Sequence, residues 1–307
     1  MLAILFKTLP FFALIALGYW AGRTRFFTQE ATAYLTKFVF YFALSAMIFR
    51  FAANLELAEV WDTQLVAAYL SGTLLVYLIA TGIGLLRGLD IQTNAVEAQC
   101  AVIGNAGFLG LPMLALLFGP QAIGPVMLVL ATDLIVFSSL IVILITIGRD
   151  GRMSVSILRT IGLGLVRNPM IVAMSLGLAW SGLQIPIPTP MNDFLSILGG
   201  AATPGALFAI GASLASKSAE RIEIAGWLSF CKLVLHPGAV ALSAIFIFQV
   251  DAFGAAMIIA CAAMPVAGNI YMLAQHYGVA PQRVSAAILV STALSVVSLT
   301  AVIAWIS

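Results

Sequence analysis

Two short stretches place helix-breaking and polar residues inside long apolar segments. One, near the middle of residues 95–118, reads Gly104-Asn105-Ala106-Gly107-Phe108-Leu109-Gly110-Leu111-Pro112. The other, near the middle of residues 253–277, reads Met264-Pro265-Val266-Ala267-Gly268-Asn269. Glycine and proline weaken or end a helix, and backbone groups freed in hydrocarbon survive only inside protein or along a polar cavity. Each stretch therefore predicts a helix that is broken near the bilayer centre, and a candidate binding site.

The second half of each broken helix would begin at the membrane midplane with free N–H groups and a partial positive charge, which suits an anion such as a carboxylate. Pro112 is expected to be the first residue of one such half-helix, where its missing N–H costs nothing. The glycines could instead serve close helix packing, but packing requires neither the proline nor a second break. The candidate substrate-binding residues are Gly104, Asn105, Gly107, Pro112, Pro265, Gly268 and Asn269.

Three ionisable residues, Asp133, Lys232 and His236, fall inside predicted membrane segments. A charge there costs on the order of 3 kcal/mol on insertion scales, so each is a functional hypothesis by default. Asp133 could pair with Lys232 or take part in proton coupling, while Lys232 could instead reach toward the cytoplasm and His236 could be a satisfied core group. By contrast, Glu97 and Arg87, close to helix ends, are interpreted as orientation signals or solvated residues.

Composition makes lipid the main solvent of this chain. It is 62% hydrophobic and 8% charged, whereas soluble domains have roughly 25% charged residues. At about 20 residues for each crossing, the sequence predicts an all-α polytopic membrane protein with ten spans: 2–21, 34–52, 63–86, 95–118, 121–147, 169–183, 193–216, 222–249, 253–277 and 284–306.

Several other functions find no support in the residues. The net charge of +2 comes with scattered basic residues, so no nucleic-acid partner is predicted. Three cysteines and two histidines show no metal-ligand spacing, and neither HExxH nor GxSxG occurs, so we predict no metal, no cofactor and no enzymatic activity. A channel stays open as an alternative to a carrier.

The distribution of lysine and arginine predicts the orientation. If the N-terminus lies outside, twelve of the 14 basic residues fall in or near cytoplasmic loops, and only Lys7 and Arg50 fall outside. Glu56, Glu59, Asp62, Asp193 and Asp251 then gather on the outer side. We therefore expect a cell-membrane protein with both termini on the extracytoplasmic side.

The sequence also matches itself. Pro10, Leu17 and Gly18 match Pro169, Leu176 and Gly177 at an offset of 159, as does Phe49 with Phe208. Near the end of each half the offset becomes 160. We therefore predict a first repeat over 1–147, a cytoplasmic linker over 148–168 and a second repeat over 169–307. Repeats of five spans each must be inverted relative to one another, as in secondary transporters, and this pairs the broken fourth and ninth spans.

These residues resemble the auxin efflux carrier family, which includes the plant PIN-FORMED carriers and bacterial malonate-type carriers. The similarity covers essentially the whole chain and rests on Leu17-Gly18-Tyr19 with Ala21-Gly22-Arg23, the stretch 104–112, Lys232 with Pro237, Pro265 with Asn269, Tyr271 and Ala274, and Ser291-Thr292 with Leu294-Ser295.

The resemblance implies an elevator-type carrier of small organic anions, often a homodimer. Spans 1, 2, 6 and 7 would form a scaffold, and spans 3–5 and 8–10 a transport part that moves the crossed fourth and ninth spans. The alternative within transport is a sodium-coupled symporter of a related inverted-repeat fold, for which Asn105, Asn269, Ser291, Thr292 and backbone carbonyls are the candidate oxygen ligands.

Overall fold

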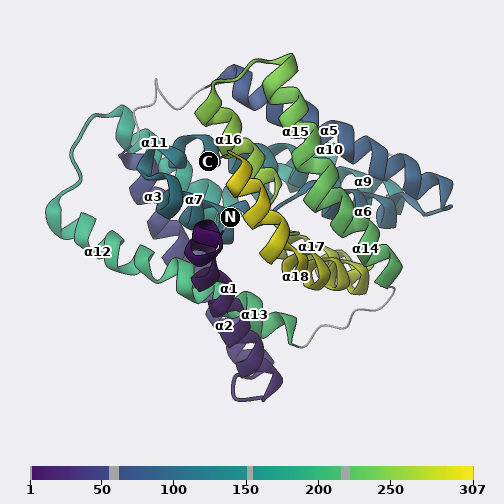
Figure 1. Ribbon diagram of the computed structural model, residues 1–307, viewed down its shortest axis with the longest axis horizontal. Coiled ribbons are helices and arrows are strands. Elements are labelled where there is room, and N and C mark those ends of the chain that lie inside the picture. The colour runs from purple at the N-terminus through teal and green to yellow at the C-terminus, as the bar shows by residue number, and fades with distance from the viewer. Residues whose placement is uncertain (1, 55–61, 151–154, 216–221, 307) are drawn as a thin grey trace.

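The computed structural model describes residues 2–54, 62–150, 155–215 and 222–306, and this part of the chain is helical apart from its connections (Figure 1). Arg152, Lys217, Arg221, Glu56 and Glu59, used above to predict orientation, lie outside the described residues. The α-helices are α1 (Leu2–Arg23), α2 (Gln29–Phe38), α3 (Leu44–Ala53), α5 (Thr63–Leu86), α6 (Ile91–Val102), α7 (Leu111–Phe118), α8 (Ile123–Thr132), α9 (Ser138–Asp150), α10 (Val155–Arg167), α11 (Pro169–Gly182), α12 (Thr189–Gly200), α13 (Ala202–Leu214), α14 (Ile222–Phe230), α15 (His236–Leu242), α16 (Ala252–Ala262), α17 (Gly268–Tyr277) and α18 (Pro281–Ile306).

Several of these α-helices continue into a short π-helical or 3₁₀ segment. Five are π-helical, namely η1 (Val39–Ala43), η2 (Ala106–Gly110), η4 (Asp133–Phe137), η5 (Cys231–Leu235) and η6 (Ser243–Ile247). The short η3 (Pro120–Ala122) is a 3₁₀ turn. Single π turns inside α-helices often mark functional sites. Asp133 lies in η4 and Lys232 lies in η5.

Six continuous helical stretches in the described residues are long and apolar enough to cross a membrane. A seventh consists of 161–167 and Pro169–Gly182, which meet at a bend of 69°. Two shorter apolar helices, Ala106–Phe118 and Ala252–Ala262, are halves of the predicted fourth and ninth spans, because both spans are interrupted. The six stretches are Gln29–Ala53, Thr63–Leu86, Pro120–Arg149, Thr189–Leu214, Ile222–Ile247 and Pro281–Ile306.

The helices form two groups. In Figure 1, the first group, α1, α2, α3, α11, α12 and α13, occupies the left and bottom of the view, and the second group, which includes α5, α6, α9 and α14, lies at the right. Within the first group the helices pack closely on glycines: a Cβ on Gly18 of α1 would overlap the carbonyl oxygen of Phe208 in α13. A Cβ on Gly177 of α11 would lie 2.7 Å from the carbonyl oxygen of Phe49 in α3. At one sequence offset, Gly18 corresponds to Gly177 and Phe208 corresponds to Phe49. The same glycine–phenylalanine contact therefore occurs twice.

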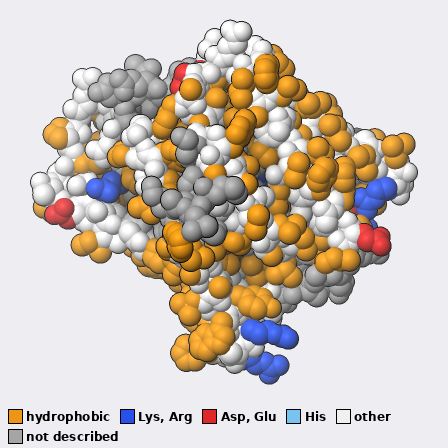
Figure 2. Space-filling model, in the orientation of Figure 1, with side chains coloured by type: hydrophobic (Ala, Val, Ile, Leu, Met, Phe, Trp, Pro, Cys, Tyr) orange, Lys and Arg blue, Asp and Glu red, His pale blue; other side chains and the backbone are white. Residues whose placement is uncertain are grey.

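Large apolar side chains cover the outside of these helices. Ile197 of α12 is 79% exposed and Val297 of α18 is 71% exposed. Figure 2 shows hydrophobic side chains over most of the visible face, with Lys and Arg near its edges. Monomeric soluble proteins rarely expose such extended apolar surface, so this face is suited to lipid.

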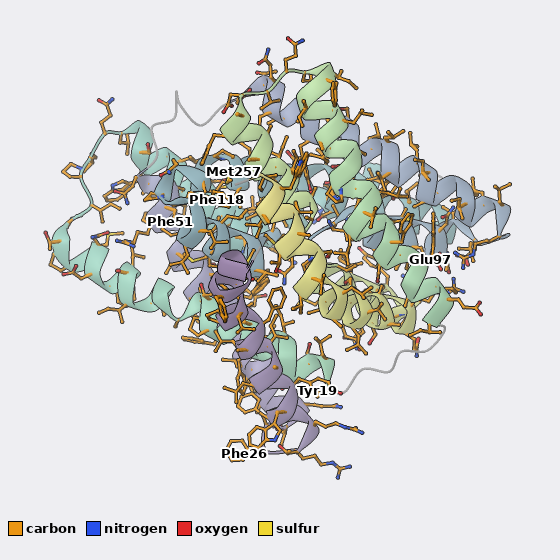
Figure 3. All side chains as sticks on the ribbon, in the orientation of Figure 1. Tyr19, Phe26, Phe51, Glu97, Phe118 and Met257 are labelled. Carbon is orange, nitrogen blue, oxygen red and sulfur yellow. The ribbon has the colours of Figure 1, made fainter. Side chains whose placement is uncertain are left out.

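Glu97 corrects one sequence interpretation. Its side chain is 3% exposed, not solvated, and it accepts from Arg87 at 2.7 Å and also from Arg283. Glu97 lies in α6, at the right of the view in Figure 3, whereas Phe26 lies at its bottom. The ion pairs join α6 to the end of α5 and the start of α18. The position of Glu97 near a helix end did not reveal its burial, because that burial depends on how α6 packs against α5 and α18.

Candidate functional site

The two interrupted helices meet at their breaks, and we call this meeting point the crossover. Residues 103–105, the first break, separate α6 from η2 and α7, and residues 263–267, the second break, separate α16 from α17. Gly104 and Val266 form an antiparallel bridge. The N–H of Asn105 donates to the carbonyl of Pro265 at 2.8 Å, and that of Ala267 donates to Ile103 at 3.1 Å. Each break thereby satisfies backbone groups that the other frees, as hydrocarbon requires.

At the first break, a side chain of the break itself caps the helical turn that follows. Asn105 is 6% exposed, and its Oδ1 accepts from the N–H of Phe108 at 3.3 Å, so it caps the following helical turn. That turn is the π turn η2, which begins at Ala106. Pro112 is therefore the second residue of α7 and not the first of the half-helix, which corrects the prediction. Because Pro112 has no N–H, the preceding turn lacks a donor, and a wide turn accommodates this loss.

At the second break, no side chain caps the helix that follows. The N-cap residue of α17, Ala267, makes no side-chain capping bond, and the position of a Cβ on Gly268 has no atom within 4 Å. Asn269 is half-buried, and its Oδ1 has no hydrogen-bond partner. Within the second break, the N–H of Val266 donates to the hydroxyl of Ser291 in α18 at 3.1 Å. The first turn of α17 thus keeps N–H groups and an amide available to a ligand.

A cavity of about 1060 Å³ opens beside both breaks, and we call it the crossover cavity. Its walls come from the end of α1, from α2 and η1, from α13, and from the start of α17. Asn105, Gly268 and Asn269 lie along its inner part, and the exposed side chains of Arg23, Arg25 and Lys37 line it too. The cavity therefore joins an exposed basic region to the buried crossover.

The predicted site residues separate into two sets. Asn105, Gly268 and Asn269 line the crossover cavity. Gly104, Gly107, Pro112 and Pro265 are outside its lining and shape the breaks instead. A Cβ on Gly107 would lie 2.8 Å from the Cε of Met170, which indicates packing at that position.

Lys232 lies directly behind the first break. Its side chain is fully buried, and a Cβ on Gly104 would lie 3.1 Å from both its Cε and its Nζ. Nζ donates to the carbonyl of Ala262, the last residue of α16, and lies 3.0 Å from His236 Nδ1. The ammonium thus occupies the negative end of a half-helix, where a cation is stabilised.

Asp133 belongs to a neighbouring part of the same polar cluster. Its Oδ1 accepts from the hydroxyl of Tyr69 at 2.9 Å, and His236 Nε2 lies 2.9 Å from the hydroxyl of Thr73. The described residues contain ion pairs only at Glu97, so Asp133 and Lys232 are not directly paired.

Tyr69 and Thr73 were not among the predicted site residues. They are spaced four apart in α5, and a polar pair at that spacing in an apolar span is a usable signal. Arg25 and Lys37 counted only toward the predicted orientation, although they line the crossover cavity together with Arg23.

The chain is similar to known membrane proteins over nearly its full length. The family described as membrane transport protein matches residues 3–303, nearly the full length of the chain. The chain belongs to this family, the auxin efflux carrier family. It is a multi-pass membrane protein of a transporter family, and the resemblance found in its sequence is confirmed.

Individual relatives of this auxin efflux carrier family member are similar over most of their length. The chain is 30% identical over 299 residues to a Rhizobium meliloti (strain 1021) protein named "Putative malonate transporter", covering 95% of this chain and 92% of the relative. It is 25% identical over 305 residues to the Escherichia coli (strain K12) protein named "Uncharacterized transporter YfdV", covering 92% and 91%.

Proposed function

We propose that this family member is a secondary carrier that moves a small carboxylate across the membrane and binds it at the start of α17. The observation that carries the proposal is the crossover cavity, because it joins exposed Arg23, Arg25 and Lys37 to the uncapped N-terminus of α17. Basic residues along a cleft concentrate anions at its entrance. Free N–H groups and the positive end of the helix then bind the carboxylate.

A malonate-like dicarboxylate is the substrate class that we favour. The name of the Rhizobium meliloti relative supports it. The cavity supports it as well, since Asn105 and Asn269 offer amides at the buried end, while the cationic side chains could hold a second carboxylate nearer to solvent.

We further propose that the carrier works as an elevator built from two inverted five-span repeats. The matched contacts of Gly18 with Phe208 and of Gly177 with Phe49 support the repeat. The crossover cavity supports the division into two parts, because α1, α2 and α13 of the proposed scaffold face α17 of the proposed transport part across it. The homodimer and the extracytoplasmic termini remain predictions from the resemblance and from the basic residues.

The test is a binding and transport series on purified protein. We expect malonate or a related dicarboxylate to raise the thermal unfolding temperature, and we expect Asn105→Ala and Asn269→Ala to weaken this response. Proteoliposomes should show uptake of the labelled substrate and counterflow against unlabelled substrate. A response that is unaltered in both variants would remove them from the site, and a steady single-channel current would indicate a channel instead.

Coupling to protons forms a second part of the proposal. Asp133 and Lys232 lie in π turns, and the ammonium of Lys232 already occupies the carbonyl end of α16 that a sodium ion would need. We therefore expect uptake to continue when choline replaces sodium. Asp133→Asn should change the pH dependence of uptake in proteoliposomes, and an unchanged pH dependence would refute the role of Asp133.

A further inference from the structure

A second hollow lies against α17, on the side of α9 and α10. We call it the linker groove, and its volume is about 500 Å³. It is lined by η4 and α9, by the end of α10, and by α17. The α17 residues Asn269, Met272, Leu273, His276 and Tyr277 that line it recur at the spacing of one helix face. The groove therefore runs along the whole of α17.

The length of this groove matches one leaflet of a bilayer. The ten residues of α17 extend for about 15 Å at 1.5 Å per residue. Half of a hydrocarbon core of about 30 Å is the same length. If Asn269 lies near the midplane, as the crossover predicts, Tyr277 lies near a membrane surface. Leu134 and Val142 form an apolar wall between these two ends.

Basic residues line the linker groove. Arg167, at the end of α10, is exposed and lines the groove together with His276. None of the described lining residues is Asp or Glu. Arg149 donates to the carbonyl of Tyr277 at 3.0 Å, which places a guanidinium at the surface end of α17. The 69° bend between 161–167 and α11 turns the end of α10 away from the direction of the crossing helix.

We propose that the linker groove binds an anionic phospholipid of the leaflet that the basic residues identify as cytoplasmic. The phosphate contacts Arg167 and His276, and one acyl chain lies along Leu134 and Val142 toward Asn269. An apolar channel one leaflet deep with a cationic end has the shape and charge of such a lipid. Asn269 and Met272 line both the linker groove and the crossover cavity, whereas Arg167 and His276 line the groove alone. Because the phosphate contacts only these two residues, the proposal does not depend on which solute is carried.

The test compares phosphatidylglycerol with phosphatidylcholine of the same acyl chains, added to the purified full chain in detergent. We expect phosphatidylglycerol to raise the unfolding temperature more than phosphatidylcholine does, and native mass spectrometry to retain it preferentially. Arg167→Gln should abolish this preference. The matched control is Arg159→Gln, because Arg159 is exposed on the same helix but does not line the groove; it should keep the preference.

Val142→Trp tests the acyl-chain part and also serves if Arg167→Gln does not fold. It should reduce the retained phosphatidylglycerol at least severalfold. Equal effects of the two lipids on the unaltered protein would overturn the proposal, as would a preference that persists in Arg167→Gln or retention that persists in Val142→Trp. Soluble glycerol phosphate should have no effect, and stabilisation by it equal to that of the lipid would show a phosphate site without a lipid.

Discussion

The two breaks differ in how they treat their free polar groups. At the first break, Asn105 caps the next turn with its own side chain and Lys232 fills the space behind Gly104. At the second break, Ala267 gives no cap, Gly268 faces open space and the Oδ1 of Asn269 has no partner. The uncapped N–H groups at the start of α17 are donors that a carboxylate or water can satisfy, so the second break suits an anion better than the first.

Two similar breaks therefore need not provide two equivalent sites. Both bring a helix start to the crossover cavity, yet a side chain caps the helix at the first break and no side chain caps it at the second. We therefore expect changes at the first break to affect mainly folding, and changes at the second break to affect mainly the affinity for the anion.

The largest effect is expected for Gly104→Val. Its Cβ would lie 3.1 Å from the carbonyl oxygen of Cys261 and from Nζ of Lys232, and the further methyl groups would have no room. We expect little or no monodisperse protein in size-exclusion chromatography. Gly268→Ala is the matched control, because nothing lies within 4 Å of its Cβ; it should purify like the unaltered protein. Equal yields of the two variants would contradict the comparison.

Asn269→Ala should come next and should act on binding. A hydrogen bond to a charged group contributes about 1.5–3 kcal/mol, so the KM for the carboxylate should rise roughly ten- to a hundredfold. The unfolding temperature without substrate should stay unchanged, because Oδ1 of Asn269 loses no partner in the protein. Uptake kinetics and thermal unfolding measured on one preparation give both values. A lower unfolding temperature with an unchanged KM would reverse the assignment of the two breaks.

Lys232→Met should act on stability. It removes the donor to the Ala262 carbonyl and the partner of His236 while keeping most of the side-chain volume. Leaving such a buried group unpaired costs about 1–3 kcal/mol. Lys37→Met, at an exposed position, is the control and should unfold like the unaltered protein. If the two variants unfold alike, Lys232 does not support the crossover.

The smallest effect is expected for Asn105, where two substitutions separate its roles. Asn105→Ala loses the cap of the turn at Phe108 and should cost about 1 kcal/mol of stability. Asn105→Asp keeps an acceptor oxygen, so it should retain the stability, but its negative charge should weaken anion binding by more than the alanine does. Thermal unfolding and substrate titration of both variants test this. Equal stability of the two variants would mean that the cap contributes nothing.

The sequence by its residue types predicted the family, most of the apolar spans and the positions of both breaks. These follow from residue types along the chain, because glycine, proline and long apolar runs act locally on a helix in lipid. The start of the half-helix after the first break was misplaced, since the sequence did not show that a π turn would precede Pro112.

Which polar residues meet depends on how distant helices pack. Glu97 is buried against Arg283, Tyr69 reaches Asp133, and Lys232 lies behind Gly104, although long stretches of chain separate the partners. Both Asn105 and Asn269 line the crossover cavity, but Asn105 caps the following turn with its Oδ1, while the Oδ1 of Asn269 has no hydrogen-bond partner. A sequence specifies the local bonding capacity of each residue, but packing between distant helices determines whether protein or ligand satisfies that capacity.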